Sequence, residues 1–555
     1  MNAQTNFSAL DRQFGDFLQN LAEESAPEVR LAAMCASRAR AEGNVCVTVR
    51  EIAEIEGAPN IASLRKKLRD SSVVGEPGAF TPLILDRHGR LYLRRYWEYE
   101  QQLAQAITNR TSASPSKGKK ETDLQEAAAR KAVRSDFTVI TGGPGTGKTW
   151  TVKRILTLLL EQPGGENLRI ALAAPTGKAA ARLTESVRAV RETFAATTIH
   201  RLLGYLPGSP YFRHDADHQL NADVVIVDEA SMVDLALMAK LLGAVPNDAR
   251  LILLGDRDQL ASVEAGSVLA DICAAAEEAV SNEPLHGAVV GLRRNYRFAE
   301  TGEIYRVSSA INSGNAEAAI AVLQEGAGGE VEWQPLPNAN KPGDALRERI
   351  VAGFRPCLET DDPLEALARL QKFRILCAVR QGPFGVENLN AVTEEILARA
   401  GLLVPRRGCY GGQPIMVTQN DYNLALFNGD SGIVLPDPDA DGDLRAFFLS
   451  AEGNLRRFLP SRLPRHETAF AITVHKSQGS EFAKVLLILP EKDSPVLTRE
   501  LLYTGLTRAR ERVELWASES TLRAAIGRRV SRTSGLRDAL AGSVRRPPGR
   551  AEEGG

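Results

Sequence analysis

Eight consecutive residues in the first third of the chain have the composition of a phosphate-binding loop. They follow an apolar run predicted to be a strand, residues 137–140, and the next predicted helix opens at their lysine. Glycines let successive backbone N–H groups face phosphate oxygens, and the lysine and threonine can serve the β/γ-phosphates and Mg2+. The residues are Gly142, Gly143, Pro144, Gly145, Thr146, Gly147, Lys148 and Thr149. A glycine-rich turn is the alternative, but this register after a strand predicts an NTPase.

Two acids close a later apolar run, residues 224–227. They are Asp228 and Glu229. Open α/β sheets bind ligands at the carboxyl ends of their strands, which places these acids beside the phosphate loop. Asp228 can hold the Mg2+ water shell, and Glu229 can position or deprotonate the attacking water. An Asp-Glu pair is more often a surface turn, but the buried strand before it favours catalysis.

Further candidates should stabilise the charge that develops on the transferred phosphoryl group, because phosphoryl transfer depends more on electrostatic stabilisation than on covalent catalysis. Gln259 follows the apolar run at residues 251–254 and can sense the γ-phosphate. Arg297 and Arg508 lie in the basic segments RNYRF and TGLTRARER. An inserted arginine can raise the rate by about 10³–10⁵. Each arginine taken singly could instead be a solvated helix charge.

The elements that position these residues alternate between strand and helix. This pattern fills residues 122–292 and resumes over residues 293–399 and 466–530, with strands expected near 374–379, 471–474 and 484–489. Such alternation predicts parallel sheets covered by helices on both faces. Residues 400–465 read instead as short strands and turns, which indicates a small β-barrel inserted into the second α/β domain.

The ends of the chain differ from this pattern. Residues 1–110 repeat Ala, Leu, Arg and Glu at helical spacing and predict a helical N-terminal domain. Within it, the aromatic and basic residues of LYLRRYWEY (residues 91–99) could stack on bases. The favoured interpretation is a helix that packs its aromatic rings against the core and exposes its arginines to solvent. Residues 111–121 have linker composition, and the tail from 531 to 555 is expected to be disordered.

Bulk composition excludes several classes of protein. The 555 residues suggest roughly three to four domains, and the net charge of −1 places any DNA contact in local grooves. Six scattered cysteines without a CxxC pair argue against structural zinc, iron–sulfur clusters and a disulfide framework. No apolar run is long enough to span a bilayer, and we expect a cytoplasmic protein.

Eight segments occur in the order in which superfamily-one DNA helicases carry them. They are GGPGTGKT, APTGKAAARL (174–183), TTIH (197–200), VIVDEAS (225–231), GDRDQL (255–260), RNYR (294–297), TVHKSQGSEF (473–482) and YTGLTRAR (503–510). The chain resembles the branch that moves 5′ to 3′. It is most similar to the RecD family, the alpha subunits of exodeoxyribonuclease V, on LASVEAGSVL (260–269), LYLRRYW and ELLYTGLTRARERV.

This resemblance implies two RecA-like motor domains that share one ATP and its Mg2+. It implies nucleotide contacts from Lys148 and the rest of the loop, metal contacts from Thr149 and Asp228, and catalytic roles for Glu229, Gln259, Arg297 and Arg508. The two arginines would come from the second domain. Gln125 matches the adenine-recognition glutamine, and Gly479 and Glu481 would also contact nucleotide. The single-strand groove would be lined by Thr176, His200, Thr473 and His475.

The resemblance further implies a helicase subunit of a complex that processes double-strand breaks. Its partners would be DNA ends and two larger subunits similar to the beta and gamma subunits. No acidic cluster of the PD…ExK kind follows the motor domains, so the nuclease is expected elsewhere. The alternatives are a stand-alone helicase of the sister branch and a degenerate motor acting as clamp or scaffold. The loop YLPGSPYF (205–212) fits a strand-separating wedge and an ordinary surface loop equally well.

Overall fold

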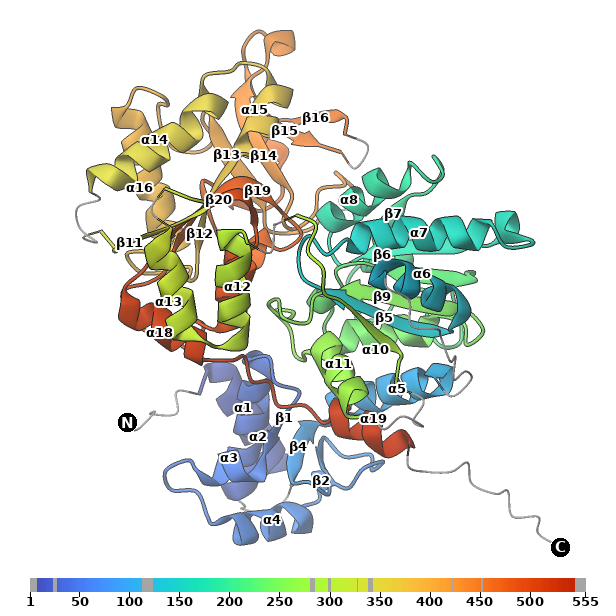
Figure 1. The fold of residues 1–555 in the computed structure, drawn as a ribbon. Helices are drawn as coiled ribbons and strands as arrows, with labels where there is room; N and C mark the ends of the chain where they lie inside the picture. The colour runs from blue at the N-terminus through green and yellow to red at the C-terminus, as the bar shows by residue number, and fades with distance from the viewer. Residues whose placement is uncertain are drawn as a thin grey trace, which may run out of the picture.

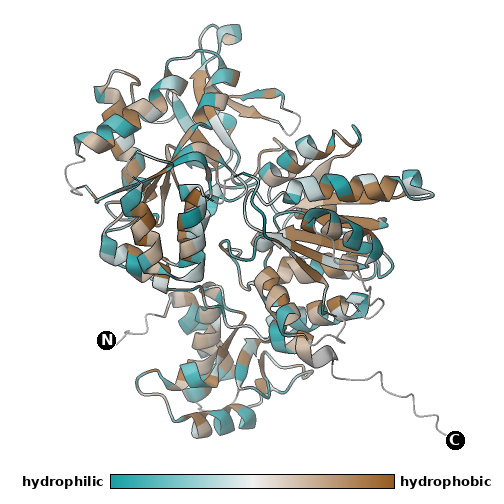
Figure 2. Ribbon diagram, in the orientation of Figure 1, coloured by the Kyte–Doolittle hydropathy of each residue, from teal (hydrophilic) through white to brown (hydrophobic). Residues whose placement is uncertain are grey.

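Two parallel sheets flanked by helices lie side by side, and a smaller N-terminal unit lies beneath them (Figure 1). The computed structural model describes residues 7–22, 27–111, 123–279, 285–297, 301–326, 328–337, 343–421, 423–450 and 453–544. Hydrophobic residues concentrate in the strands of both sheets, and the outer faces of the helices are mostly hydrophilic (Figure 2). The prediction of two RecA-like α/β units is confirmed.

The first sheet has six parallel strands in the order β10-β5-β9-β8-β6-β7. Its strands are β5 (Phe137–Gly142), β6 (Ile170–Ala174), β7 (Ala196–Thr198), β8 (Val224–Val227), β9 (Arg250–Gly255) and β10 (Val289–Leu292). Its helices are α6 (Leu124–Arg134), α7 (Lys148–Leu160), α8 (Gly177–Val187), α9 (Ile199–Leu202), α10 (Leu235–Ala244) and α11 (Val268–Glu278). Every residue of β8 is buried, because helices cover both faces of the sheet.

The second sheet has five parallel strands in the order β11-β20-β19-β12-β18. They are β11 (Val331–Gln334), β12 (Phe373–Cys377), β18 (Ala471–Thr473), β19 (Phe482–Ile488) and β20 (Ala509–Trp516). The surrounding helices are α12 (Glu303–Ser313), α13 (Ala316–Glu325), α14 (Asp344–Leu358), α15 (Pro363–Leu370), α16 (Val386–Arg399), α17 (Arg499–Leu506) and α18 (Glu519–Gly527).

Between α16 and β18 the chain forms a five-stranded sheet whose pairings are all antiparallel. The strands are β13 (Gln413–Val417), β14 (Ser431–Pro436), β15 (Leu444–Leu449), β16 (Leu455–Phe458) and β17 (His466–Thr468), in the order β16-β15-β14-β13-β17. Among the described residues no pairing joins β16 to β17. The insertion is therefore a β-sheet at the predicted place, and its closure into a barrel stays a prediction.

The N-terminal unit is not purely helical, and this corrects the sequence-based expectation. It holds α1 (Ala9–Leu21), α2 (Pro27–Ala41), α3 (Val49–Ala53), α4 (Ile61–Asp70) and α5 (Arg94–Thr111). It also holds a four-stranded sheet of β1 (Cys46–Thr48), β2 (Val74–Gly75), β3 (Leu83–Leu85) and β4 (Arg90–Leu93). Strands of two to four residues are too short to give an alternating pattern in the sequence. The segment LYLRRYW divides accordingly between β4 and the start of α5.

The predicted disordered tail is also wrong over part of its length. Residues 536–544 form α19 (Leu536–Val544), whose Leu536 and Leu540 are about 1% exposed. They share a core with Leu103 and Ile107 of α5 and with Ile272 of α11. In Figure 1 the red C-terminal segment crosses from α18 to this helix beside α5 and α11. Residues 545–555 lie outside the described residues, as do residues 112–121 of the predicted linker.

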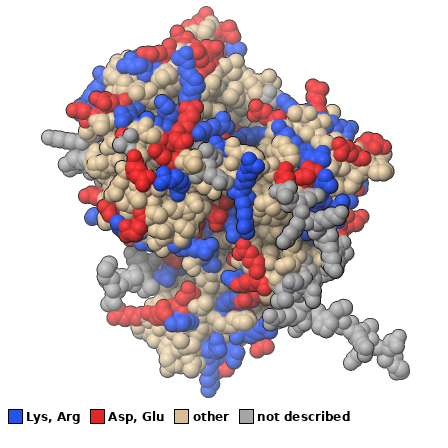
Figure 3. Space-filling model, viewed as in Figure 1, with Lys and Arg blue, Asp and Glu red and all other residues tan. Residues whose placement is uncertain are grey.

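Acidic and basic side chains are interspersed over the face drawn in Figure 3, without one continuous field of either sign. This distribution agrees with a net charge of −1. Among the described helices, none combines the length and apolar character needed to cross a membrane.

Candidate nucleotide-binding cleft

The predicted phosphate loop joins β5 to α7. Gly145 and Gly147 have φ angles of 81° and 86°, a left-handed conformation that suits glycine. Gly147 precedes α7 and supplies no side-chain cap, so the first N–H groups of the helix are left for an anion. The Lys148 ammonium donates to the carbonyl oxygens of Gly142 at 2.6 Å and Gly143 at 3.1 Å. The lysine thus already lies over the loop.

Gln125 lies directly against this loop. Its side-chain Nε2 donates to the Thr146 carbonyl oxygen at 2.8 Å. A Cβ atom added to Gly147 would lie 1.9 Å from the same nitrogen, so the close approach requires glycine there. The predicted adenine-recognition residue is therefore adjacent to the phosphate loop, and its contact with a base stays a prediction.

Asp228 and Glu229 follow β8 as predicted. Burial and, to a lesser degree, the neighbouring Glu229 charge raise the pKa of Asp228 to about 6, although Lys148 opposes the shift. The Glu229 N–H donates to Asp228 Oδ1 at 2.8 Å. Glu229 itself has a φ of 53°, which is strained for a residue with a side chain. Such strain concentrates at active sites, where the surrounding structure holds it.

Asp256, at the end of the adjacent strand β9, is a site residue that sequence reasoning missed. It is 1% exposed, and burial raises its pKa to about 6. Its Oδ2 accepts hydrogen bonds from Gln259 Nε2 at 3.0 Å and from Tyr503 Oη at 3.0 Å. The segment GDRDQL pointed to this position, because Asp256 follows its strand just as Asp228 follows β8. Tyr503 comes from α17 and so joins the second unit to the first.

Glu481 is the meeting point of three arginines. It pairs with Arg297 at 2.6 Å, Arg510 at 2.8 Å and Arg182 of α8 at 2.9 Å. Burial would raise the pKa of Glu481, but Arg182 and Arg297 hold it well below its usual range. The predicted nucleotide residue Glu481 is thus an ionised carboxylate between the two units. Arg182 was missed, although it lies in the quoted segment APTGKAAARL.

The two predicted arginines both lie near the cleft. Arg297 follows β10 of the first sheet by only a few residues, and its origin in the second domain stays a prediction. The side-chain Nδ2 of its neighbour Asn295 donates to the Pro144 carbonyl oxygen at 2.9 Å. The backbone N–H of Tyr296 donates to the Gly145 carbonyl oxygen at 2.7 Å. This segment therefore lies on the phosphate loop.

Arg508 does come from the second unit and is 3% exposed. Its guanidinium donates to the carbonyl oxygens of Thr504 at 3.1 Å and Ser480 at 3.2 Å. Burial lowers its pKa, and the charges of Glu229 and Glu481 oppose that shift. The cation thus lies within electrostatic range of the candidate base.

The predicted DNA-groove residues are less closely grouped. Thr176 caps α8 by accepting from Ala179 N, and a Cβ on Gly479 would lie 3.6 Å from its hydroxyl oxygen. Thr473 ends β18 and accepts from the N–H of Lys476 at 3.2 Å. His475 is half-buried, and its burial lowers its pKa. His200 packs edge-on against Phe212, with ring centroids 5.7 Å apart.

The predicted wedge is a hairpin. Tyr205 and Phe212 form an isolated antiparallel bridge, and Tyr211, next to the bridge, is 70% exposed. Lys240 Nζ donates to the Pro210 carbonyl oxygen at 2.7 Å, which fixes the hairpin to α10. An exposed aromatic ring on an anchored hairpin is compatible with a strand-separating wedge and with an ordinary surface loop.

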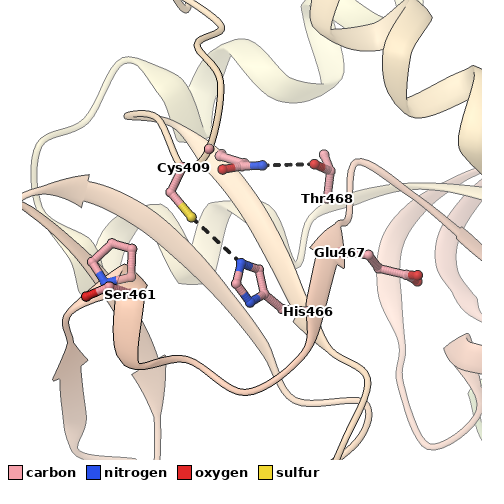
Figure 4. Close-up of a pocket in the computed structure, with 8 residues that line it drawn as sticks. Cys409, Ser461, His466, Glu467 and Thr468 are labelled. Atoms are coloured by element: carbon pink, nitrogen blue, oxygen red, sulfur yellow. Dashed lines mark hydrogen bonds between the residues drawn. The ribbon is translucent and has the colours of Figure 1, made fainter.

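A pocket of about 640 Å³ lies in the inserted sheet, away from these residues. Figure 4 shows Cys409 and His466 facing each other across it, with Sγ and Nε2 3.7 Å apart. Its floor carries a hydrogen bond of 2.9 Å from Gln413 Nε2 to Thr468 Oγ1. None of its lining residues belongs to the phosphate loop or to the acids that follow β8 and β9.

The side chains around the phosphate loop suit Mg2+. Thr149 is the second residue of α7, next to Lys148, and Asp228 supplies a carboxylate at the end of β8, which is separated from β5 by β9. Mg2+ prefers oxygen ligands and is usually held by one or two protein groups together with water and phosphate oxygens. One hydroxyl and one carboxylate are the donor set expected for a nucleotide-bound ion.

Three family models match the chain. The model described as RecBCD enzyme subunit RecD, N-terminal domain matches residues 3–92, the AAA domain matches 125–265, and the UvrD-like helicase C-terminal domain matches 468–515.

Curated relatives match over nearly the full length. RecBCD enzyme subunit RecD of Mycolicibacterium smegmatis is 42% identical over 547 residues, which cover 94% of this chain and 95% of that protein. The subunit of the same name from Haemophilus influenzae is 36% identical and covers 81% and 80%. The ATP-dependent RecD2 DNA helicase of Deinococcus radiodurans is 32% identical, but the match covers only 58% of its length. The chain belongs to the RecD family of superfamily-one helicases.

Proposed function

We propose that this chain is the RecD-type motor of a RecBCD-like complex, an ATP-dependent helicase that moves 5′ to 3′ along single-stranded DNA. The observation that carries the proposal is the cleft between the two α/β units. The first unit brings the phosphate loop and the carboxylates of Asp228 and Asp256, and the second brings Tyr503 and Arg508. Nucleotide bound between them would link ATP hydrolysis to their relative movement.

Within this proposal each side chain has a defined task. Lys148 and the loop N–H groups bind phosphate oxygens, and Thr149 and Asp228 hold Mg2+, which neutralises charge on the phosphates. Glu229 accepts a proton from the attacking water, and Gln259 contacts the γ-phosphate. Arg297 and Arg508 stabilise the charge that develops on the transferred group. Gln125 contacts the adenine, and Gly479 and Glu481 also contact the nucleotide.

Movement follows from alternating closure of the cleft. Closure on ATP and opening after hydrolysis would change which unit grips the strand near Thr176, His200, Thr473 and His475. Separation of each base-pair step costs about 1.4 kcal/mol on average. The hairpin at residues 205–212, and the inserted sheet closed as a small barrel, are the proposed elements that guide and separate the strands.

The matches favour a complex subunit over a stand-alone helicase. The chain spans nearly the whole length of the mycobacterial RecD relative, whereas it spans little more than half of the RecD2 relative. We therefore propose a cytoplasmic assembly with two larger subunits, which would supply the nuclease, and the N-terminal unit as its docking domain. A degenerate motor is disfavoured, since Lys148, Asp228, Glu229, Arg297 and Arg508 are all present.

Strand displacement by the purified chain tests the proposal. We expect ATP hydrolysis stimulated by single-stranded DNA and displacement from 5′ overhangs only. Lys148→Gln should lower the ATPase kcat by about 10²–10³-fold, because it removes one preorganised cation from the transferred phosphate. Lys153→Gln, one turn further along α7, is the matched control and should keep wild-type turnover.

Three results would contradict parts of the proposal. Displacement from 3′ overhangs alone would reverse the polarity. Full turnover by Lys148→Gln would mean that the phosphate site is assigned wrongly. A native chain that purifies without two larger subunits and unwinds long duplexes unaided would favour the stand-alone alternative.

A further inference from the structure

The loop that follows the candidate γ-phosphate sensor contacts three parts of the molecule. We call residues 260–266 the sensor loop, because Gln259 and Asp256 immediately precede it. At its start, Leu260 N donates to Thr504 Oγ1 at 3.0 Å, and Gln478 Nε2 donates to the Leu260 carbonyl oxygen at 2.8 Å. Both partners belong to the second unit. A movement of the second unit would therefore displace the start of the sensor loop.

The other end of the sensor loop is held by one arginine. The Arg532 guanidinium donates to the carbonyl oxygens of Ser262 at 2.6 Å, Glu264 at 2.8 Å and Gly266 at 2.8 Å. Gly266 N in turn donates to the Gly43 carbonyl oxygen of the N-terminal unit at 3.0 Å. A planar guanidinium with five fixed donors can gather several carbonyl groups in this way, whereas a lysine offers one small charged group.

Arg532 belongs to the C-terminal strap, which we define as residues 528–535, between α18 and α19. At the start of the strap, Arg528 is anchored to the second unit through Asp493 and the carbonyl oxygen of Leu497. At its end, Gly535 N donates to Glu100 Oε2 of α5 at 2.8 Å. The strap crosses between the units along the path visible in Figure 1.

Glycine at two positions allows this strap to lie so close. A Cβ on Gly43 would approach the Arg532 guanidinium carbon to 2.9 Å, and a Cβ on Gly535 would approach the Tyr92 hydroxyl to 2.2 Å. Thr533 extends the contact, because its carbonyl oxygen accepts from Val45 N at 2.9 Å. The strap is thus closely packed against the N-terminal unit and hydrogen-bonded to its backbone.

We propose that Arg532 is a positioning residue for ATP hydrolysis, which acts through the sensor loop on Gln259 and Asp256. This inference rests on the proposed helicase function and extends it. The strap moves with the second unit at one end and is fixed to the N-terminal and first units at the other. Arg532 therefore fixes the position of the sensor loop relative to the phosphate loop. It also connects the ATP site to the N-terminal unit.

Steady-state ATPase of the full chain with saturating single-stranded DNA tests this role. Arg532→Ala should lower kcat by about 10-fold while KM for ATP and DNA affinity stay within about twofold, since misplacement of a reacting group by a fraction of an ångström suffices for such a loss. Arg532→Lys should recover part of the loss. Hydrogen exchange of residues 256–266 should quicken in Arg532→Ala.

Arg537→Ala is the matched control. Arg537 lies on α19, outside the strap, and pairs with Glu278 at the surface. It should keep wild-type kcat and wild-type exchange at residues 256–266. Equal kcat values for Arg532→Ala and Arg537→Ala would overturn the inference, as would a rise in KM for ATP with unchanged kcat.

If Arg532→Ala does not fold, Arg532→Lys decides the question alone, with about a threefold loss of kcat expected at an unchanged melting temperature. An unchanged kcat in that folded variant would overturn the inference. A wild-type chain without DNA-stimulated hydrolysis would instead refute the proposed function, so the two failures are distinguishable.

Discussion

The two α/β units share an architecture but place their cleft residues on different elements. In the first unit, acids follow parallel strands directly: Asp228 follows β8 and Asp256 follows β9. In the second unit the cleft residues lie around α17, where Tyr503 precedes Arg508 by five residues. Its parallel strands β12 and β18 end instead in Cys377 and Thr473.

Under the proposed function, this difference would separate nucleotide binding from the coupling of hydrolysis to movement. The phosphate loop, Asp228 and Glu229 lie on one sheet and would hold nucleotide whether the cleft is open or closed. The Tyr503 hydroxyl and the Arg508 guanidinium would complete the site only when the two units approach, so the second unit would couple hydrolysis to movement.

The largest effect should come from removal of the second unit's cation. Arg508→Ala should lower kcat by about 10³-fold and leave ATP affinity within a few-fold, because an inserted arginine acts mainly on the transition state. Stopped-flow binding of a fluorescent ATP analogue and steady-state hydrolysis measure the two quantities. Arg512→Ala is the control, since Arg512 pairs with Glu332 on the far side of β20 from this contact.

A parallel loss of ATP affinity and turnover in Arg508→Ala would break the comparison. It would mean that the second unit helps to bind nucleotide and does not merely respond to it. Arg508→Lys should rescue little, because the ammonium cannot reproduce the guanidinium geometry.

The first unit was the easier one to predict. The apolar runs at residues 137–140, 224–227 and 251–254 correspond to β5, β8 and β9, because buried parallel strands give continuous apolar runs. Lys148, Asp228 and Glu229 lie within or next to such runs, so local sequence was enough to place them. Short strands such as β2 and β11 carry no comparable signal.

Contacts between distant segments could not be predicted from local pattern. The bond from Tyr503 to Asp256 spans 247 positions, and nothing in either segment specifies the other. Arg532 lay in a segment whose arginines, glycines and prolines indicated disorder, yet its donors meet carbonyl groups some 266 to 270 positions away. The composition of a segment indicates whether that segment is ordered in isolation. Tyr503, Asp256 and Arg532 are held instead by hydrogen bonds to residues that are distant in the sequence.

An intermediate effect should follow from removal of the hydroxyl that joins the two units. Tyr503→Phe should lower kcat by about 10–100-fold, because a hydrogen bond to a buried carboxylate contributes about 1.5–3 kcal/mol. The variant also raises the pKa of Asp256, since the Tyr503 hydroxyl holds it lower than burial alone would. Tyr305→Phe, a partly buried tyrosine elsewhere in the second unit, is the matched control. Equal turnover of Tyr503→Phe and the wild type would show that this contact is packing only.

The last effect bears on folding stability rather than on turnover. It concerns the strap that ties the two units together, and it depends on pH. Burial raises the pKa of Glu100 to about 7 from a usual value of 4.5, while the Gly535 N–H and Arg90 oppose that shift. A carboxyl group whose pKa is higher in the folded chain stabilises it below the unfolded pKa, and this stabilisation is lost as pH rises towards 7. From pH 5 to pH 8 the loss should be about 2–3 kcal/mol.

Glu100→Gln removes this titration but keeps an oxygen that can accept from Gly535 N. Melting temperatures of the wild type and the variant should therefore diverge between pH 5 and pH 8, with the variant the more stable at the higher pH. Glu98→Gln, on the exposed side of the same helix, should run parallel to the wild type. Parallel curves for Glu100→Gln would mean that the carboxylate is already ionised at pH 5. The strap would then be held by an ion pair with Arg90 rather than by a protonated acid, and it would stay equally tight across this range.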